Sequence, residues 1–199
     1  NGYFVAEPNR LLKQRIEAYY ESAEKHGWPD RLNRGPFKFG WDAEKRRGIV
    51  TCRYIHLVLP GHDREHELER FRLGLVLQWH YYGPFGFGAI VAAAKGVDPD
   101  TVDLSKPIDG QDLIDGEIAL FGSADEVGEA ILRVKESCGY DDFMFHTWFE
   151  SGGLSGREVE EQMQAFAEDV APGLRSACGG SPKREESSVS FDDVRGAGA

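Results

Sequence analysis

The chain has 199 residues, an ordinary size for one domain, and its 34 acidic and 23 basic side chains give a formal net charge of -11. This charge argues against a nucleic-acid-binding surface, because phosphate contacts would need a basic patch and none is visible. No apolar run approaches the ~20 residues of a membrane helix, and no secretory signal is present. We therefore expect a soluble, cytoplasmic protein with neither nucleic acid nor membrane among its partners.

The first expected elements are a short strand and a helix. Residues 2–5 (GYFV) form the strand, and Pro8 suits the first turn of the helix, where its missing N–H costs nothing. Gly27 suits the left-handed cap at the helix end, and Pro29 prevents continuation. Helical spacing predicts a buried face that consists of Leu12, Ile16, Tyr19 and Ala23.

A second strand is expected at residues 49–59 (IVTCRYIHLVL), after a long polar connection at 29–48. Alternation divides the strand between a face with Arg53 and Ile55 and a face with Tyr54 and His56, and the sequence does not say which faces inward. A helix is expected to begin at Asp63. Its apolar face would consist of Leu68, Phe71, Leu75 and Trp79.

The next region is glycine-rich at residues 83–88 (GPFGFG). It is not a phosphate-binding loop, because it lacks the G-x-x-x-x-G-K-[ST] string and follows a helix rather than a strand. A short helix is expected at 89–95, and 98–115 is expected to be a polar excursion with turn signals at Pro99 and Pro107.

Residues 122–175 read as helix, strand and helix. Ser123 with Glu126 and Ser155 with Glu158 have the spacing of capping boxes, and Gly139 ends the first helix. The aromatic run 143–149 reads as a buried strand. The second helix has Val159, Met163, Phe166 and Val170 at helical spacing, and it is expected to stop near Pro172.

The string FGSADEVGEAILRVKESCGYDDFMFHTW, with EEQMQAFAEDVAPGLR after it, resembles the end of the bacterial luciferase-like flavin-dependent monooxygenase family. RYIHLVLPGHDREHE also resembles that family's seventh strand, although Pro60-Gly61 departs from its pattern. The resemblance implies an α/β fold, namely the C-terminal part of a (β/α)8 TIM barrel with an insertion between the last two strands. The barrel portion would be residues 1–178, and 179–199 would form a polar extended tail.

A complete barrel typically needs about 250 residues and eight strands. Only three parallel-strand candidates are visible here, and the sequence starts at Asn1 as if within a strand. We therefore expect a fragment, a processed chain or one of two polypeptides, with the N-terminal part of the barrel as its partner.

The resemblance implies an oxidoreductase that uses reduced FMN and oxygen to oxidise a small organic substrate. It also implies a homo-oligomer and a flavin reductase as partners. Two alternatives stay open: a deazaflavin-dependent oxidoreductase on the same scaffold, and a non-catalytic interaction protein made from part of a barrel.

His56 and His146 are the candidate catalytic residues, because imidazoles ordinarily titrate near neutral pH and both stand near strand ends. The resemblance favours His56, since several family members have a pocket histidine at the matching position. Both could equally be satisfied core histidines. The expected flavin or substrate pocket consists of Tyr54 and Trp148, with Tyr81, Tyr82 and Phe85 in a lid; an aromatic helical hairpin would explain the last three as well.

Two further patterns are expected to carry no chemistry. HDREH at residues 62–66 matches the H-x-x-E-H zinc pattern, but a helix entrance explains these polar residues better and no metal is expected. Cys52, Cys138 and Cys178 are odd in number and widely spaced, so they read as reduced thiols without a structural role.

Overall fold

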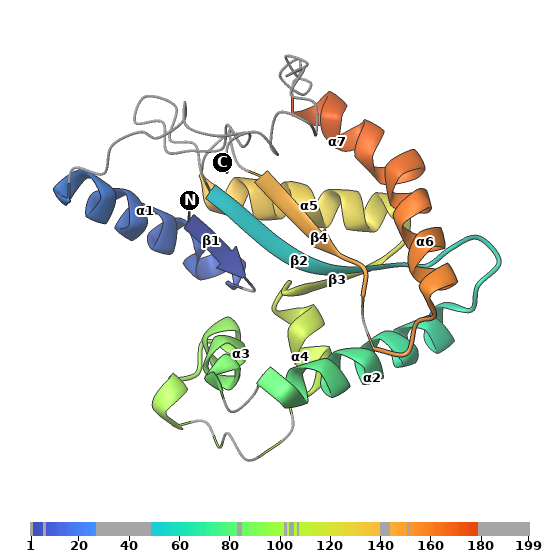
Figure 1. Ribbon diagram of the computed structural model, residues 1–199, viewed down its shortest axis with the longest axis horizontal. Coiled ribbons are helices and arrows are strands. Elements are labelled where there is room, and N and C mark those ends of the chain that lie inside the picture. The colour runs from blue at the N-terminus through green and yellow to red at the C-terminus, as the bar shows by residue number, and fades with distance from the viewer. Residues whose placement is uncertain are drawn as a thin grey trace, which may run out of the picture.

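A computed structural model describes residues 2–5, 7–26, 49–82, 85–101, 103, 106, 108–139, 144–150 and 152–178. Its centre is a four-stranded parallel sheet (Figure 1). The strands are β1 (Gly2–Val5), β2 (Ile49–Leu57), β3 (Ala119–Gly122) and β4 (Met144–Trp148). All three other strands pair with β2, which is therefore the centre of the sheet.

The two edges of β2 are used differently. On one edge β1 pairs with its first half, from Gly2↔Ile49, and β3 pairs with its second half, from Tyr54↔Ala119. On the other edge β4 pairs with the middle of β2, from Val50↔Met144 to Tyr54↔Trp148. Parallel neighbours require crossover connections, and helices supply them here.

One face of the sheet is covered by α5 (Ala124–Cys138) and by the closing helices α6 (Gly156–Ala165), η3 (Phe166–Val170) and α7 (Ala171–Ala177). Ile55 and Leu57 of β2 pack here against Val127 and Ile131 of α5. The helix α1 (Asn9–Lys25) packs on α5 through a second cluster, which consists of Leu12, Ile16, Tyr20, Val134 and Cys138.

The opposite face meets α2 (Arg64–Tyr82), α3 (Phe87–Lys95) and α4 (Gly110–Asp115), with the short turn η2 (Pro99–Thr101) between the last two (Figure 1). Its core joins Tyr54 of β2 to side chains of all three helices: Phe71, Leu75, Trp79, Val91 and Leu113. The face of β2 that carries Tyr54 and His56 is thus the one beneath α2.

Several sequence predictions are confirmed. Both capping boxes form, since the Ser123 and Ser155 hydroxyls accept from the amides of Glu126 and Glu158. Gly139 ends α5 in the left-handed conformation, with a φ of 70°. The strand at 2–5 and the short helix at 89–95 are present as well.

Other elements were not predicted or differ from their predicted bounds. The polar stretch 98–115 ends in α4, with Asp109 as N-cap, and this helix was not predicted. Residues 119–122 form β3, a strand that was not predicted, since four residues give little periodicity. The strands expected at 49–59 and 143–149 are shorter, and end at Leu57 and Trp148. In α1 the fully buried aromatic is Tyr20, while Tyr19 is only half-buried.

The closing helix also differs from expectation. It does not stop near Pro172 but continues through the π-helical turn η3 into α7. Pro172 is tolerated because it lies in the first turn of α7, where its missing N–H is not needed. Met163 is 52% exposed, and the buried residue of α6 is its neighbour Gln162.

Gln162 is buried because its amide binds the end of β2. The Leu57 N–H donates to Gln162 Oε1 at 2.6 Å, and Gln162 Nε2 donates to the Leu57 carbonyl at 2.8 Å. A second close contact joins α2 to the loop before α6, where a Cβ on Gly74 would lie 2.1 Å from the Gly152 carbonyl oxygen. These two contacts fix both α6 and α2 against the carboxyl ends of the strands.

Two expected segments, 29–48 and the tail 179–199, lie outside the described residues, and the boundary at residue 178 stays a prediction. The described strands and crossover helices confirm the α/β class. Such a parallel sheet is common to open α/β folds and barrels, so the barrel itself stays a prediction. No helix in the described ranges is both long and apolar enough to cross a membrane.

Candidate functional site

Four of the predicted site residues lie on one face of the sheet, on β2 and β4. The register pairs Tyr54 with Trp148 and Cys52 with His146. Because side chains alternate along a strand, His146 and Trp148 share the face of Tyr54 and His56. His56 stands one residue before the carboxyl end of β2, where parallel α/β folds place their sites.

Aromatic rings form a continuous cluster on this face. Tyr54 contacts Trp148 with ring centroids 5.0 Å apart, and Trp148 contacts His146 at 5.8 Å. On its other side Tyr54 meets Trp79 of α2 at 6.4 Å, and Trp79 meets Phe87 at 5.5 Å. The cluster therefore runs from the exposed His146 through the buried core to α3.

The lid residues are placed differently from one another. Tyr82 joins the cluster, with its ring 5.2 Å from that of Phe87. Tyr81 and Phe85 are 76% and 80% exposed. Tyr81 also borders a shallow cavity of about 340 Å³ between α2 and the loop after β4. The structure thus brings Tyr82 to the aromatic cluster, and the pocket role of all three stays a prediction.

His56 is fully buried between two aromatic rings. The Phe71 ring of α2 lies 5.1 Å from the imidazole, and the Phe121 ring of β3 is stacked at 5.9 Å. Nε2 of His56 is 2.7 Å from Oε2 of Glu67, and no hydrogen-bond partner for Nδ1 occurs within the described ranges. Burial lowers the pKa of His56, although the bond to Glu67 partly opposes this effect. His56 is therefore held neutral near pH 7.

Glu67 connects His56 to other charged groups. Its Oε1 is 3.1 Å from Nδ1 of His62 and 3.6 Å from Nη1 of Arg70. Burial raises the pKa of the Glu67 carboxyl, but the bonds from His56 and His62 and the charge of Arg70 outweigh burial, so the net pKa is lowered. Glu67 is consequently an anion at neutral pH.

Glu67 was missed in the sequence, although a signal for it exists. It stands four residues before Phe71, at the head of the stripe formed by Phe71, Leu75 and Trp79. An acidic residue in register with a buried stripe points toward the core, and here it meets the histidine of the preceding strand. The H-x-x-E-H reading directed attention to Glu65 instead, which is exposed.

The residues of the zinc pattern do not converge. His62 contacts Glu67, whereas the side chain of His66 is exposed. In the part of the chain that the structure describes, no group of three or more His, Cys, Asp or Glu side chains could hold a metal ion.

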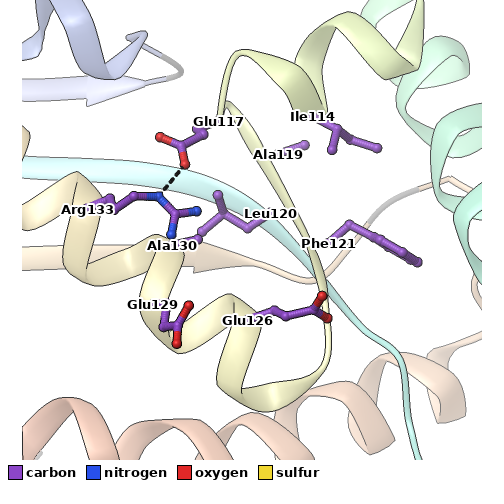
Figure 2. Close-up of a pocket in the computed structure, with 9 residues that line it drawn as sticks. All are labelled: Ile114, Glu117, Ala119, Leu120, Phe121, Glu126, Glu129, Ala130 and Arg133. Atoms are coloured by element: carbon purple, nitrogen blue, oxygen red, sulfur yellow. Dashed lines mark hydrogen bonds and ion pairs between the residues drawn. The ribbon is translucent and has the colours of Figure 1, made fainter. Parts of the chain in front are cut away.

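A second cavity, of about 260 Å³, lies between β3 and the helices α4 and α5 (Figure 2). Arg133 donates to Glu117 at 2.7 Å across its wall, and Glu126 and Glu129 project from α5. Of the aromatic rings around His56, only Phe121 borders it, and none of the predicted site residues does. The cavity is therefore separate from the candidate site.

No protein-family model matches the sequence, and neither does any curated protein. Among solved structures, 86% of the chain aligns with a type II Baeyer-Villiger monooxygenase at 20% sequence identity and a TM-score of 0.49. That protein is the oxygenating constituent of 3,6-diketocamphane monooxygenase from the CAM plasmid of Pseudomonas putida, in complex with FMN. This chain spans 42% of its length. Function is therefore inferred from the chain's own residues and motifs.

Proposed function

We propose that this chain forms the C-terminal portion of a flavin-dependent monooxygenase, which uses reduced FMN and oxygen to oxidise a small organic substrate. The observation that carries the proposal is the placement of His56, Tyr54 and Trp148 on one face at the carboxyl ends of parallel strands. Barrel enzymes place their active sites at this end. The sequence of the strand with His56 also resembles the family's seventh strand.

The residues at this site fit a flavin in two respects. Buried polar atoms normally have a partner, so the unpartnered Nδ1 of His56 suits a site that a ligand completes. Tyr54 and Trp148 offer an aromatic wall of the kind that lines cofactor sites. When bound, the reduced flavin would supply the electrons that reduce oxygen. His56 would hold or release a proton at Nδ1, and the aromatic rings around it would keep water away.

The remaining part of the barrel is a proposed partner. Parallel sheets are normally covered on both faces, yet His146 is exposed and Trp148 is only half-buried on the face of His56. The N-terminal part of the barrel, within a longer chain or in a separate one, would cover this surface and supply the flavin-phosphate site. A flavin reductase and a second copy of the assembly complete the proposed set of partners.

Anaerobic titration with reduced FMN tests the proposal. Under anaerobic conditions the intact protein, with any chain that co-purifies, is expected to bind reduced FMN. When oxygen and a substrate are then added, the protein is expected to consume oxygen. Binding of a deazaflavin coenzyme instead, with no oxygen uptake, would support the hydride-transfer alternative. An assembly that binds neither coenzyme would refute both enzyme readings and favour the interaction protein.

The role of His56 is tested with His56→Gln, whose amide can still donate to Glu67. We expect the variant to bind FMN but to lose most of its turnover, since a positioned proton-transfer group contributes about 10²-fold or more. His66→Gln is the matched control, because His66 is exposed on the same helix as Glu67. Unchanged turnover in His56→Gln would make His56 a structural residue.

A further inference from the structure

Glu67 holds two imidazoles that differ in their access to water. His56 is fully buried and is bound to one carboxylate oxygen at 2.7 Å, while His62 is 44% exposed and is bound to the other at 3.1 Å. The carboxylate therefore bridges the interior of the site and the surface of the protein through two hydrogen bonds.

The geometry and charges fix where the protons lie at rest. Glu67 is ionised, so it can only accept, and each histidine nitrogen that faces it is a donor. Neutral His56 thus carries its proton on Nε2, which leaves a lone pair on the buried and unpartnered Nδ1. This nitrogen can take up a proton only if the proton on Nε2 can leave toward Glu67.

We propose that Glu67 and His62 form a proton path that connects His56 with bulk water. The path rests on the proposed function for its purpose, which is to carry protons to and from the reacting groups, but its existence does not depend on flavin. Glu67 and His62 would act through His56 and are positioning residues rather than catalytic ones.

One passage moves a single proton and no electrons. A proton bonds to the lone pair of His56 Nδ1, and the Nε2 proton passes to Oε2 of Glu67. His62, which is in contact with water, gives its Nδ1 proton to water and takes a proton from water on Nε2, so that its Nδ1 is bare. The carboxylic acid of Glu67 then rotates and gives its proton to Nδ1 of His62. His62 then releases its Nε2 proton to water, so that His62 again donates to ionised Glu67. The reverse sequence delivers a proton to the site.

The surrounding charges hold the path in place without entering it. Arg70 lies 3.6 Å from Oε1 of Glu67 and is itself held by Glu158 at 2.7 Å and by the Gly153 carbonyl at 3.1 Å. On the β3 side, the guanidinium of Arg64 lies 5.3 Å from the centre of the Phe121 ring and pairs with Glu126. The contact of Glu67 with the exposed imidazole of His62 is what points to transfer, because Arg70 stays charged at neutral pH and offers no such exchange.

The test is the rate at which the Nε2 proton of His56 exchanges with water, measured by NMR on the intact protein with isotopically labelled histidine. The nitrogen shifts are expected to show His56 protonated on Nε2. A fully buried N–H without a path exchanges only when the protein opens. His62→Gln is expected to slow exchange by about 100-fold, in line with the contribution of a positioned proton-transfer group.

Two controls make the result decisive. His66→Gln should leave the exchange rate unchanged, and added imidazole buffer should restore part of the rate in His62→Gln. Glu67→Gln should slow exchange as well; should that buried substitution unfold the protein, the surface variant His62→Gln still decides. Equal exchange rates in wild type and His62→Gln would overturn the path while leaving FMN binding as it is. Conversely, a protein that binds no FMN but shows the His62 effect keeps the path and loses the proposed function.

Discussion

Each face of β2 buries one basic side chain, Arg53 on one and His56 on the other, and their hydrogen-bond partners differ in kind. Within the described part of the chain, Arg53 donates to neutral acceptors: the carbonyls of Glu7 at 2.8 Å and Cys52 at 2.7 Å, Oδ1 of Asn9 at 2.9 Å, and Oγ1 of Thr51 at 3.2 Å. His56 is bound to an ionisable carboxylate that is in turn bound to an exposed imidazole.

The difference shows how a buried polar group can serve either structure or chemistry. Burial lowers the pKa of Arg53 to about 10, so its charge stays fixed at neutral pH and ties β2 to the start of α1. Neutral acceptors cannot take a proton from it. Glu67, the partner of His56, can accept a proton, so the charge on that face can change.

The largest expected effect is on stability, and it comes from removing the buried charge of Arg53. Arg53→Met removes the hydrogen bonds to Glu7 and Asn9, and bonds from a charged donor are each worth about 1.5–3 kcal/mol. We expect the free energy of unfolding, measured with denaturant, to fall by about 3 kcal/mol or more. The matched control is Arg157→Met, since Arg157 is 87% exposed and its pair with Glu161 is of the kind that contributes little. A loss of the same size in both variants would contradict the stabilising role of the Arg53 hydrogen bonds.

A smaller effect is expected where α2 meets the loop before α6, the contact that helps to fix Glu67 beneath β2. Gly74→Ala would place a Cβ 2.1 Å from the Gly152 carbonyl oxygen, so the backbones must separate. Overpacking of this kind typically costs about 1–3 kcal/mol.

Gly156→Ala is the control for Gly74→Ala, because a Cβ there meets no atom within 4 Å. Alanine is also the better helix former, so this variant should be neutral or slightly stabilising. If thermal unfolding shows Gly74→Ala to be as stable as Gly156→Ala, the close contact does not exist in solution.

The smallest expected effect is a change in the slope of the free energy of unfolding against pH, and it tests the titration of His56. The pKa of folded His56 lies below the ordinary value of 6.5, because burial disfavours its charged form. Between those two values the unfolded chain binds a proton that the folded chain does not, so stability rises with pH through this window. His56→Gln should flatten the rise just below pH 6.5 when the free energy of unfolding is measured against pH.

The His56→Gln variant should still lose stability in a second, more acidic pH range. The pKa of Glu67 is lowered below its ordinary value of 4.5, so its contribution is present above that pH and disappears as the pH falls through the folded value. In His56→Gln part of this contribution survives through His62 and Arg70. Identical pH profiles for wild type and variant would show that His56 does not titrate as inferred.

The sequence predicted elements whose ends carry chemical signals. The capping boxes at Ser123 and Ser155 and the left-handed stop at Gly139 were readable because each end satisfies backbone groups with a specific side chain or a glycine. β3 was not readable, since its pairing with residues 54–57 of β2 stabilises it rather than its own pattern.

The candidate site was predicted only in part for a similar reason. His56 and Tyr54 could be placed together, because alternation along one strand sets their common face. Glu67 approaches His56 only through the way α2 packs on the sheet, and the exposure of Tyr81 and Phe85 follows from the same packing. Contacts between elements of this kind are not encoded in the spacing of residues along one element.

The bond between Gln162 and Leu57 also bears on how this sheet avoids unwanted association. The amides of Tyr54 and Val58 donate toward the β3 side, to Ile118 and Gly122, so by alternation the peptide groups of Leu57 point toward the edge that β4 occupies. β4 has already ended there, and an unpaired strand edge is a template onto which another chain can add. The amide of Gln162 supplies one donor and one acceptor, as a strand residue would, and closes that position with a side chain. The end of β2 is thereby protected from strand addition at this position.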